Sequence, residues 1–201
     1  MFSNFTMDKL EKAFTLFDTY NKKSPEKIVW EGEEYPSEYF FALKLYDWVK
    51  KLEPDASESL LLASRAQHIG RWEIPRKTYP DGRVGYLKWR SDLGKFHAQT
   101  AAALLAEAGY DEDIIKRVRE IIQKQRLKAD ADVQTIENAL CLVFLEFQFD
   151  DLIEKLSEEK MIEILRKTWG KMSEPGRQYA LGMKFSKQGT NLIAKALNDD
   201  V

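Results

Sequence analysis

Apolar side chains recur at helical spacing along most of the chain, and this pattern constrains its fold more than any other feature. Near residues 5–20, Leu10, Phe14 and Phe17 fall on one face at spacings of four and three residues. Residues 132–147 are apolar nearly all round, which is typical of a helix at the centre of a fold. The pattern predicts an all-α fold.

Helix boundaries follow from capping residues, glycines and prolines. Besides 5–20, we expect helices over 38–52, from 55 toward 68, 92–108, 111–122, 132–147, 150–156, 158–169, 175–185 and 190–197, with Ser37, Asp55, Asp92, Asp111 and Asp132 as candidate caps. The segment 27–36 favours a short extended hairpin around Glu31-Gly32. No other segment predicts a sheet.

Between Ile74 and Ser91 the helical spacing breaks down. Two prolines and two glycines punctuate this segment, which predicts a long irregular loop between two core helices. Loops of this length in compact domains are usually functional or disordered. Five aromatic residues lie within or beside it, and a segment so rich in aromatics is not expected to be disordered.

The length of 201 residues favours one domain over 1–201, with a single sizeable core. No apolar run reaches the roughly 18 residues that a membrane-spanning helix needs, and the N-terminus lacks a signal-peptide pattern. Cys141 is the single cysteine, so no internal disulfide can form, and its apolar neighbours favour a buried, inert thiol. We therefore expect a cytoplasmic protein without a membrane partner. The oligomeric state is left open.

The charge is unevenly distributed. The formal net charge is −2, which disfavours a general nucleic-acid binder. From residue 65 to residue 95 the chain carries an excess of basic over acidic residues: Arg65, Arg71, Arg76, Lys77, Arg83, Lys88, Arg90 and Lys95 against Glu73, Asp81 and Asp92. The rest of the chain is acidic. The positive segment is therefore the expected functional surface.

Arginines and aromatic residues alternate in this segment. A guanidinium group forms paired hydrogen bonds to phosphate or carboxylate and stacks on aromatic rings, although a charge run is usually just a solvated surface. Arginine dominates over lysine here, which favours binding of a phosphorylated or other anionic small molecule. The expected ligand-binding residues are Arg65, Gln67, Arg71, Trp72, Arg76, Tyr79, Arg83, Tyr86, Trp89 and Arg90.

The two histidines, His68 and His97, flank the irregular segment, so a loop that returns to its origin would bring them together. Two imidazoles with carboxylates such as Asp132 and Glu137 can bind a divalent ion, Mn, Fe, Mg or Zn. Alternatively, each histidine caps a helix or hydrogen-bonds a neighbour. Glu137 lies where the central helix becomes buried, so it should bind a metal or pair with an arginine of the loop. His68, His97 and Glu137 are the candidate catalytic residues.

Three long strings resemble the family labelled domain of unknown function 4202: PDASESLLLASRAQHIGRWEIPR, YPDGRVGYLKWRSDLGKFHA and DVQTIENALCLVFLE. The resemblance covers about residues 39–146, with the helices of 150–197 expected to pack on this core. The sequence contains no Walker loop, GxSxG elbow, GxGxxG or HExxH motif, so those enzyme classes are set aside.

A second resemblance is to HD-domain phosphohydrolases. LLLASRAQHIGR is similar to the helix that carries their His-Asp pair, and DVQTIENAL to the helix that bears their final metal-binding aspartate. The resemblance implies an HD-like helical bundle. This chain departs from the family pattern, since Gln67-His68 stands where His-Asp is expected and Asn138 where the last aspartate should be.

Three functions follow. The first is an HD-like protein that binds a phosphorylated small molecule of the nucleotide class. Its expected activity is that of a metal-dependent phosphohydrolase, in which a metal activates water or an imidazole transfers a proton. The alternative is a non-catalytic anion- or nucleotide-binding module on a degenerate HD scaffold. The third, single-stranded RNA binding, rests on the alternating basic and aromatic residues and is disfavoured by the net charge.

Overall fold

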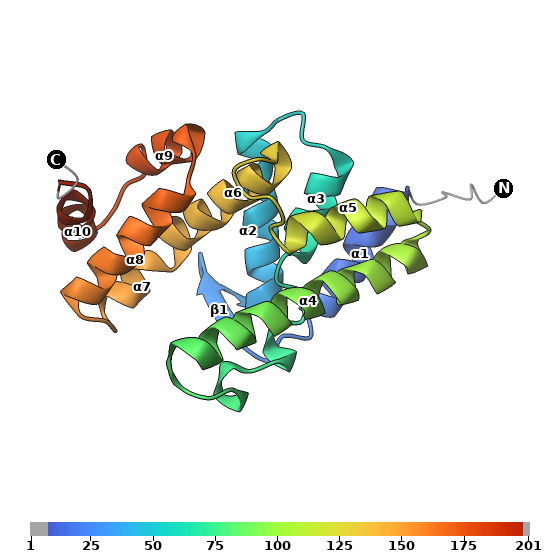
Figure 1. Cartoon of the computed structure of the whole chain (residues 1–201), viewed down its shortest axis with the longest axis horizontal. Helices are drawn as coiled ribbons and strands as arrows, with labels where there is room; N and C mark the ends of the chain where they lie inside the picture. The colour runs from blue at the N-terminus through green and yellow to red at the C-terminus, as the bar shows by residue number, and fades with distance from the viewer. Residues whose placement is uncertain (1–7, 199–201) are drawn as a thin grey trace.

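The computed structural model describes residues 8–198 and is built mainly from α-helices (Figure 1). The helices are α1 (Lys9–Asn21), α2 (Ser37–Leu52), α3 (Glu58–Ala66), α4 (Gly82–Ala108), α5 (Glu112–Ile122), α6 (Ala131–Phe147), α7 (Phe149–Ile153), α8 (Glu158–Lys171), α9 (Glu174–Leu181) and α10 (Lys187–Asn198), with 3₁₀ turns η1 (Arg71–Glu73) and η2 (Arg76–Thr78). The all-α class is confirmed. The start expected for the first helix at residue 5 lies outside the described residues.

The expected hairpin is confirmed as two antiparallel strands, β1 (Lys27–Trp30) and β2 (Glu33–Pro36). Lys27 pairs with Pro36 and Trp30 with Glu33, so a two-residue turn joins the strands. Its residues, Glu31 and Gly32, have φ of 52° and 85°. Positive φ at both positions is the geometry that matches the twist of a hairpin, and glycine adopts it without a Cβ clash.

The helices form two groups along the long axis (Figure 1). In one group, α2 packs on α3, α3 on α5, and α4 on both α5 and α1. In the other group, α8 packs on α10. Helix α6 packs on α2 of the first group and on α8 and α9 of the second, so it connects the two groups. Within residues 8–198, no helix combines the length and apolarity that a bilayer crossing requires.

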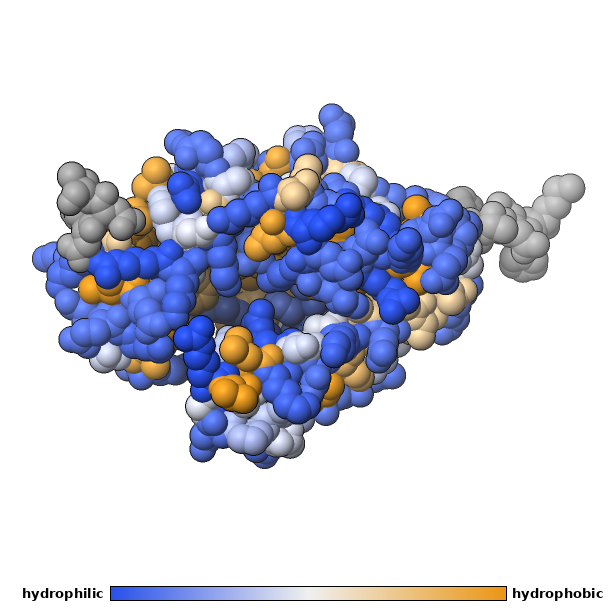
Figure 2. Space-filling view, viewed as in Figure 1, coloured by the Kyte–Doolittle hydropathy of each residue, from blue (hydrophilic) through white to orange (hydrophobic). Residues whose placement is uncertain are grey.

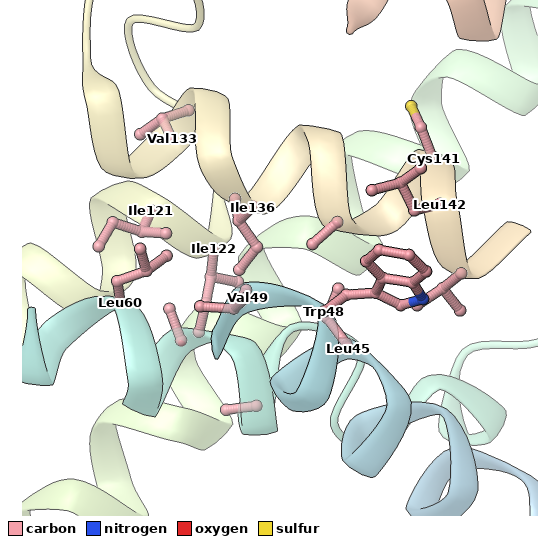
Figure 3. Close-up of a cluster of buried hydrophobic side chains, with 14 of the residues drawn as sticks. Leu45, Trp48, Val49, Leu60, Ile121, Ile122, Val133, Ile136, Cys141 and Leu142 are labelled. Carbon is pink, nitrogen blue, oxygen red and sulfur yellow. The ribbon is translucent and has the colours of Figure 1, made fainter. Parts of the chain in front are cut away.

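The core is deepest where α2, α3, α5 and α6 meet (Figure 3). Val49, Leu60, Ile121, Val133 and Ile136 are all fully buried. The central position expected for the segment 132–147 is therefore confirmed, and the helical spacing of its apolar residues explains why this face is buried.

Cys141 lies in α6 and is 6% exposed. Burial raises the pKa of its thiol to about 12. The thiolate is the reactive form of cysteine, so this side chain is inert near neutral pH, as expected from its apolar neighbours.

The irregular segment is shorter than the sequence predicts. α4 begins at Gly82 rather than near Asp92, so only residues up to Asp81 are irregular. Gly85, which reads as a helix breaker, instead lets the helix pack closely, because a Cβ there would lie 1.9 Å from the Pro80 carbonyl oxygen. The glycine is needed for tertiary contact, and local pattern alone does not distinguish that role from a turn.

Several expected caps are corrected. The side chain of Asp111 does accept from the backbone N–H of Ile114 at 3.0 Å. Ser57 caps α3 instead of Asp55, and Asp130 caps α6 instead of Asp132. Ser37 lies in the first turn of α2, whose N-cap is Pro36, and Asp92 lies inside α4. The capping residue is the one whose backbone dihedral angles are not helical. When several short polar residues lie within two or three positions of each other, the sequence does not show which of them that is.

Candidate functional site

The two histidines meet in the structure. Their ring centroids are 5.8 Å apart. His68 follows the end of α3, as expected, whereas His97 lies near the middle of α4 rather than in the first turns of a helix, because that helix begins earlier. The expected convergence of the two imidazoles is confirmed.

A small cavity of about 100 Å³ lies against the two rings. We call it the histidine cavity, and it is lined by Gln67, His68, Arg71, Arg90, Leu93, Gly94, His97, Ile122, Gln123 and Lys124. Its volume is roughly that of three water molecules in the liquid, which is room for a compact group of phosphate size. Residues from the segment after α3, from η1, α4 and the end of α5, and from the turn after α5 therefore converge on one space.

One hydrogen bond fixes the orientation of the His97 ring. Nδ1 donates to the carbonyl oxygen of Ile69 at 2.6 Å, since a carbonyl can only accept. Burial lowers the pKa of His97 to about 4, although the Ile69 bond opposes the shift, so the ring is neutral at pH 7. Nε2 then carries a lone pair, and it is buried without a hydrogen-bond partner among the described residues.

Gln67 has a similar arrangement. Its side-chain Nε2 donates to the carbonyl oxygen of Ile122 at 2.9 Å, which fixes the orientation of the amide. The other end, Oε1, is buried and has no partner within residues 8–198. Gln67 and His97, which both line the cavity, thus each carry a buried acceptor atom that has no hydrogen-bond partner among the described residues. Buried polar atoms in this state usually mark a place for water or a ligand.

Three cationic side chains line the same cavity: Arg71, Arg90 and Lys124. The Arg71 guanidinium lies 5.5 Å from the centroid of the Trp89 ring, which holds it beside the cavity. Burial lowers the pKa of His68 well below its usual value, and Arg71, His97 and Lys124 lower it further. The cavity is therefore a region of positive potential with neutral imidazoles inside it.

Glu137 is linked to the site, as expected, but through lysines rather than a loop arginine. Its side chain is 3% exposed, and its carboxylate lies 2.5 Å from Lys124 Nζ and 3.5 Å from Lys171 Nζ. Burial raises the pKa of Glu137, but the two lysines outweigh this effect and hold the pKa below its usual value. Glu137 thus positions the Lys124 ammonium group at the cavity.

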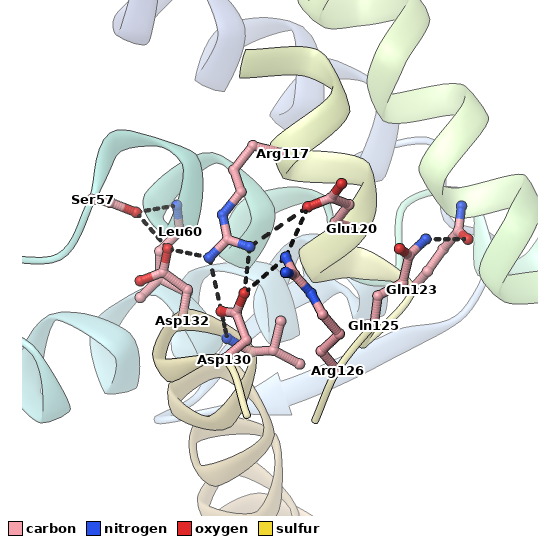
Figure 4. Close-up of polar contacts among 10 residues, drawn as sticks. Ser57, Leu60, Arg117, Glu120, Gln123, Gln125, Arg126, Asp130 and Asp132 are labelled. Atoms are coloured by element: carbon pink, nitrogen blue, oxygen red, sulfur yellow. Dashed lines mark hydrogen bonds and ion pairs between the residues drawn. The ribbon is translucent and has the colours of Figure 1, made fainter. Parts of the chain in front are cut away.

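Asp132 lies in a different cluster (Figure 4). Its carboxylate accepts from Arg117 at 2.8 Å and from Ser57 at 3.0 Å, next to Asp130, which also pairs with Arg117. The four side chains expected to hold a metal, including Asp132 and Glu137, are therefore not assembled as one set. Among residues 8–198, no group of three or more His, Cys, Asp and Glu side chains is placed to hold a metal ion. Metal binding stays a prediction.

The five arginines that were expected to bind an anionic ligand do not all lie at one site. Arg65 is buried and pairs with Asp18 at 2.5 Å, so it belongs to the core rather than the site. Arg76 donates to the carbonyl oxygen of Tyr79 at 3.0 Å, and Arg83 is exposed on α4. Of the five arginines, Arg71 and Arg90 line the histidine cavity. The five arginines are evenly spaced along the sequence, but they point to different sides of the fold because the segment turns and part of it is buried.

The aromatic residues of this segment mostly hold the fold together. Trp89 is 7% exposed and donates to the carbonyl oxygen of Ile74 at 2.8 Å, and Tyr79 donates to Asp92 at 3.1 Å. Trp72 contacts the Tyr20 ring, and Tyr86 is 45% exposed. Trp89 and Tyr79 thus tie this segment to the fold, and single-stranded RNA binding stays a prediction.

Two further hollows adjoin the histidine cavity. The first, about 240 Å³, shares His68 and Arg71 with it and is also lined by Glu38; we call it the Glu38 cavity. The second, about 620 Å³, contains Arg71, Trp72 and Trp89; we call it the tryptophan groove. Arg71 lines all three spaces. Figure 2 shows a recess in the middle of the face of the molecule that is in view, next to the lobe that contains the start of α4.

Sequence reasoning missed Lys124 and Glu38. Lys124 lies in the turn after α5 with φ of 55°, and Glu38 in the first turn of α2. Neither position has a distinctive motif. The only available signal was that a buried acid in α6 needs a cation nearby, which pointed to a partner for Glu137 without identifying it.

Acidification should test the environment of His97. An imidazole in the unfolded chain takes up a proton near pH 6.5, whereas His97 in the fold does so near 4. Because the unfolded state binds more protons between these values, the free energy of unfolding falls as the pH falls, by roughly 3 kcal/mol for this group. In the variant His97→Asn, whose amide can still donate to Ile69, this loss should be absent.

The measurement is urea unfolding of both proteins from pH 7 to pH 4.5. The stability advantage of the wild type over His97→Asn should shrink steadily across this range. Glu38, whose pKa burial raises to about 7, contributes with the opposite sign but equally to both proteins, so it cancels in the difference. A difference that stays constant with pH would contradict a buried neutral His97.

Comparison with known proteins identifies one family. The model of the family described as "Domain of unknown function (DUF4202)" matches residues 11–193, which is most of the chain. No curated protein and no solved structure matches the chain. The match extends beyond residues 39–146 at both ends, so it includes most of α1, all of α7, α8 and α9, and the first part of α10.

Proposed function

The chain belongs to the DUF4202 family, and we propose that it binds a phosphorylated small molecule whose phosphate group enters the histidine cavity. The observation that carries the proposal is the convergence of Arg71, Arg90 and Lys124 on a cavity whose lining, in the part of the chain that the structure describes, includes no acidic residue. Guanidinium and ammonium groups bind phosphate through charge-assisted hydrogen bonds. A cytoplasmic location fits the single, buried Cys141.

The interior of the cavity complements this ligand. A phosphate group that carries a proton can donate to the lone pair of His97 Nε2 or to Gln67 Oε1, while its other oxygens accept from the cations. A phosphate with one proton supplies one of the two buried acceptors with the partner that it lacks, which offsets the cost of leaving that acceptor unpaired.

Binding without catalysis is favoured over hydrolysis. On the HD-like bundle that we propose as the scaffold, Asn138 occupies the place of the final metal-binding aspartate. Asn138 accepts from the Ser173 backbone N–H at 2.9 Å and donates to its Oγ at 2.8 Å, so it ties α6 to the start of α9. Asp132 and Glu137 are likewise engaged with cations. These contacts tie all three side chains to other parts of the fold.

Phosphohydrolase activity is the second candidate, and His97 is the observation that favours it. A neutral imidazole whose Nε2 has no hydrogen-bond partner among the described residues can take a proton from water beside a bound phosphate. His68 lies within reach of the same space. Activity of this kind should be lost in both His68→Ala and His97→Ala.

The test is titration calorimetry and thermal unfolding with inorganic phosphate, pyrophosphate and a panel of phosphomonoesters at constant ionic strength. At a ligand concentration 100 times Kd, bound ligand should stabilise the fold by about 2.7 kcal/mol. Sodium acetate serves as the control for charge alone. No stabilisation by any phosphorylated compound would reject the proposal, and release of phosphate from a bound ester would replace it with the hydrolase.

A further inference from the structure

The Glu38 cavity opens beside the histidine cavity and is suited to a different part of the same ligand. Both spaces are lined by His68 and Arg71, so they adjoin at these two side chains, and a ligand with its phosphate in one can place its organic part in the other. The second space is the larger, about 240 Å³ against 100 Å³. It has room for the organic part of a small phosphomonoester.

The polar groups of the Glu38 cavity are mainly acceptors. Two carboxylates, Glu26 and Glu38, line it, with the hydroxyl of Ser37 and the amide of Gln148. Within residues 8–198, no hydrogen bond or ion pair of the fold engages the Glu38 carboxylate, although Arg71 attracts it electrostatically. Burial and the neighbouring Glu26 raise the pKa of Glu38 to about 7. This carboxylate is held half-buried without a donor.

The remaining wall is apolar. Phe41, Leu45, Leu140 and Val143 come from α2 and α6 and face the same space. Leu45 is 3% exposed and Val143 is 5% exposed, so this wall is part of the packed core and is fixed in shape. A carbon skeleton can lie on it, and groups that donate hydrogen bonds can point toward Glu38.

We propose that the ligand is a phosphomonoester of a polyhydroxylated compound, with its hydroxyl groups bound by Glu38 in the cavity beside the phosphate. This inference rests on the proposed function and specifies its substrate class. A hydroxyl group donates to a carboxylate without adding charge, and Arg71 already supplies the one cation that lines this cavity. The alcohol end of the ligand is thus recognised in the Glu38 cavity and its phosphate end in the histidine cavity.

The experiment compares ribose 5-phosphate, methyl phosphate and O-phosphoethanolamine by titration calorimetry at pH 8, where Glu38 is ionised. Wild-type protein should bind ribose 5-phosphate at least about 10-fold more tightly than methyl phosphate, since each hydrogen bond to a charged group contributes roughly 1.5–3 kcal/mol. In Glu38→Gln this preference should fall by about 10-fold, while the affinity for methyl phosphate stays within about twofold.

Matched variants keep the result interpretable. Glu34→Gln, on the exposed face of β2, should behave as the wild type, and Glu26→Gln provides a second change in the cavity should Glu38→Gln fail to fold. Equal affinity for ribose 5-phosphate and methyl phosphate would overturn the inference while phosphate binding stands. Tighter binding of O-phosphoethanolamine would overturn it in favour of an amine. Failure of all three to bind would reject the proposed function itself.

Discussion

Arg71→Ala is expected to weaken the binding of pyrophosphate by about 10- to 100-fold, because a charge-assisted hydrogen bond contributes roughly 1.5–3 kcal/mol. Arg71 is the one side chain that lines the histidine cavity, the Glu38 cavity and the tryptophan groove. Arg71 is also the charged group that lowers the pKa of His68 most, after the effect of burial. In Arg71→Ala the pKa of His68 should therefore rise toward its usual value.

The affinity is measured by titration calorimetry at constant ionic strength. Arg83→Ala is the matched control, because Arg83 is exposed on α4 of the same basic segment and lines none of the three spaces. It should leave Kd within about twofold. Equal losses in the two variants would mean that binding follows the overall charge of the segment rather than the cavity, and an unchanged Kd in Arg71→Ala would remove the site.

Asp18→Ala is expected to cost about 3 kcal/mol of stability without changing the affinity for pyrophosphate. Arg65 is 8% exposed, pairs with Asp18 at 2.5 Å and lies over the rings of Phe14 and Tyr46. Removing the carboxylate leaves a buried guanidinium without its counter-charge. Breaking a buried ion pair in this way strongly lowers the free energy of unfolding. Urea unfolding measures the loss.

Two further variants separate the ion pair from local effects. Thr19→Ala changes the exposed neighbour on α1 and should alter stability by no more than about 0.5 kcal/mol. The double variant Asp18→Leu/Arg65→Met replaces both charges by apolar groups and should recover most of the lost stability. A loss of pyrophosphate affinity in Asp18→Ala would mean that Arg65 contributes to binding, which would contradict its assignment to the core.

Local patterns predicted the elements of this fold. The spacing of Leu10, Phe14 and Phe17 marked one helix, and the pair Glu31-Gly32 marked the hairpin turn. Both depend on residues within four positions of each other, so a sequence read in short windows contains the required information. The proximity of the two histidines could also be inferred, because both flank one segment whose ends return to the same place.

What surrounds each charged side chain was decided only by tertiary structure. Arg65, Arg71 and Arg83 look equivalent in the sequence, yet one is a core ion pair, one lines the cavities and one faces solvent. Gly85 likewise reads as a break until Pro80 is seen to pack against it. The sequence alone determined most of the helical segments, although not the first turns of α4, since hydrogen bonds and apolar spacing in a helix are local. The partner of a buried charge comes from distant parts of the chain, so only packing determines it.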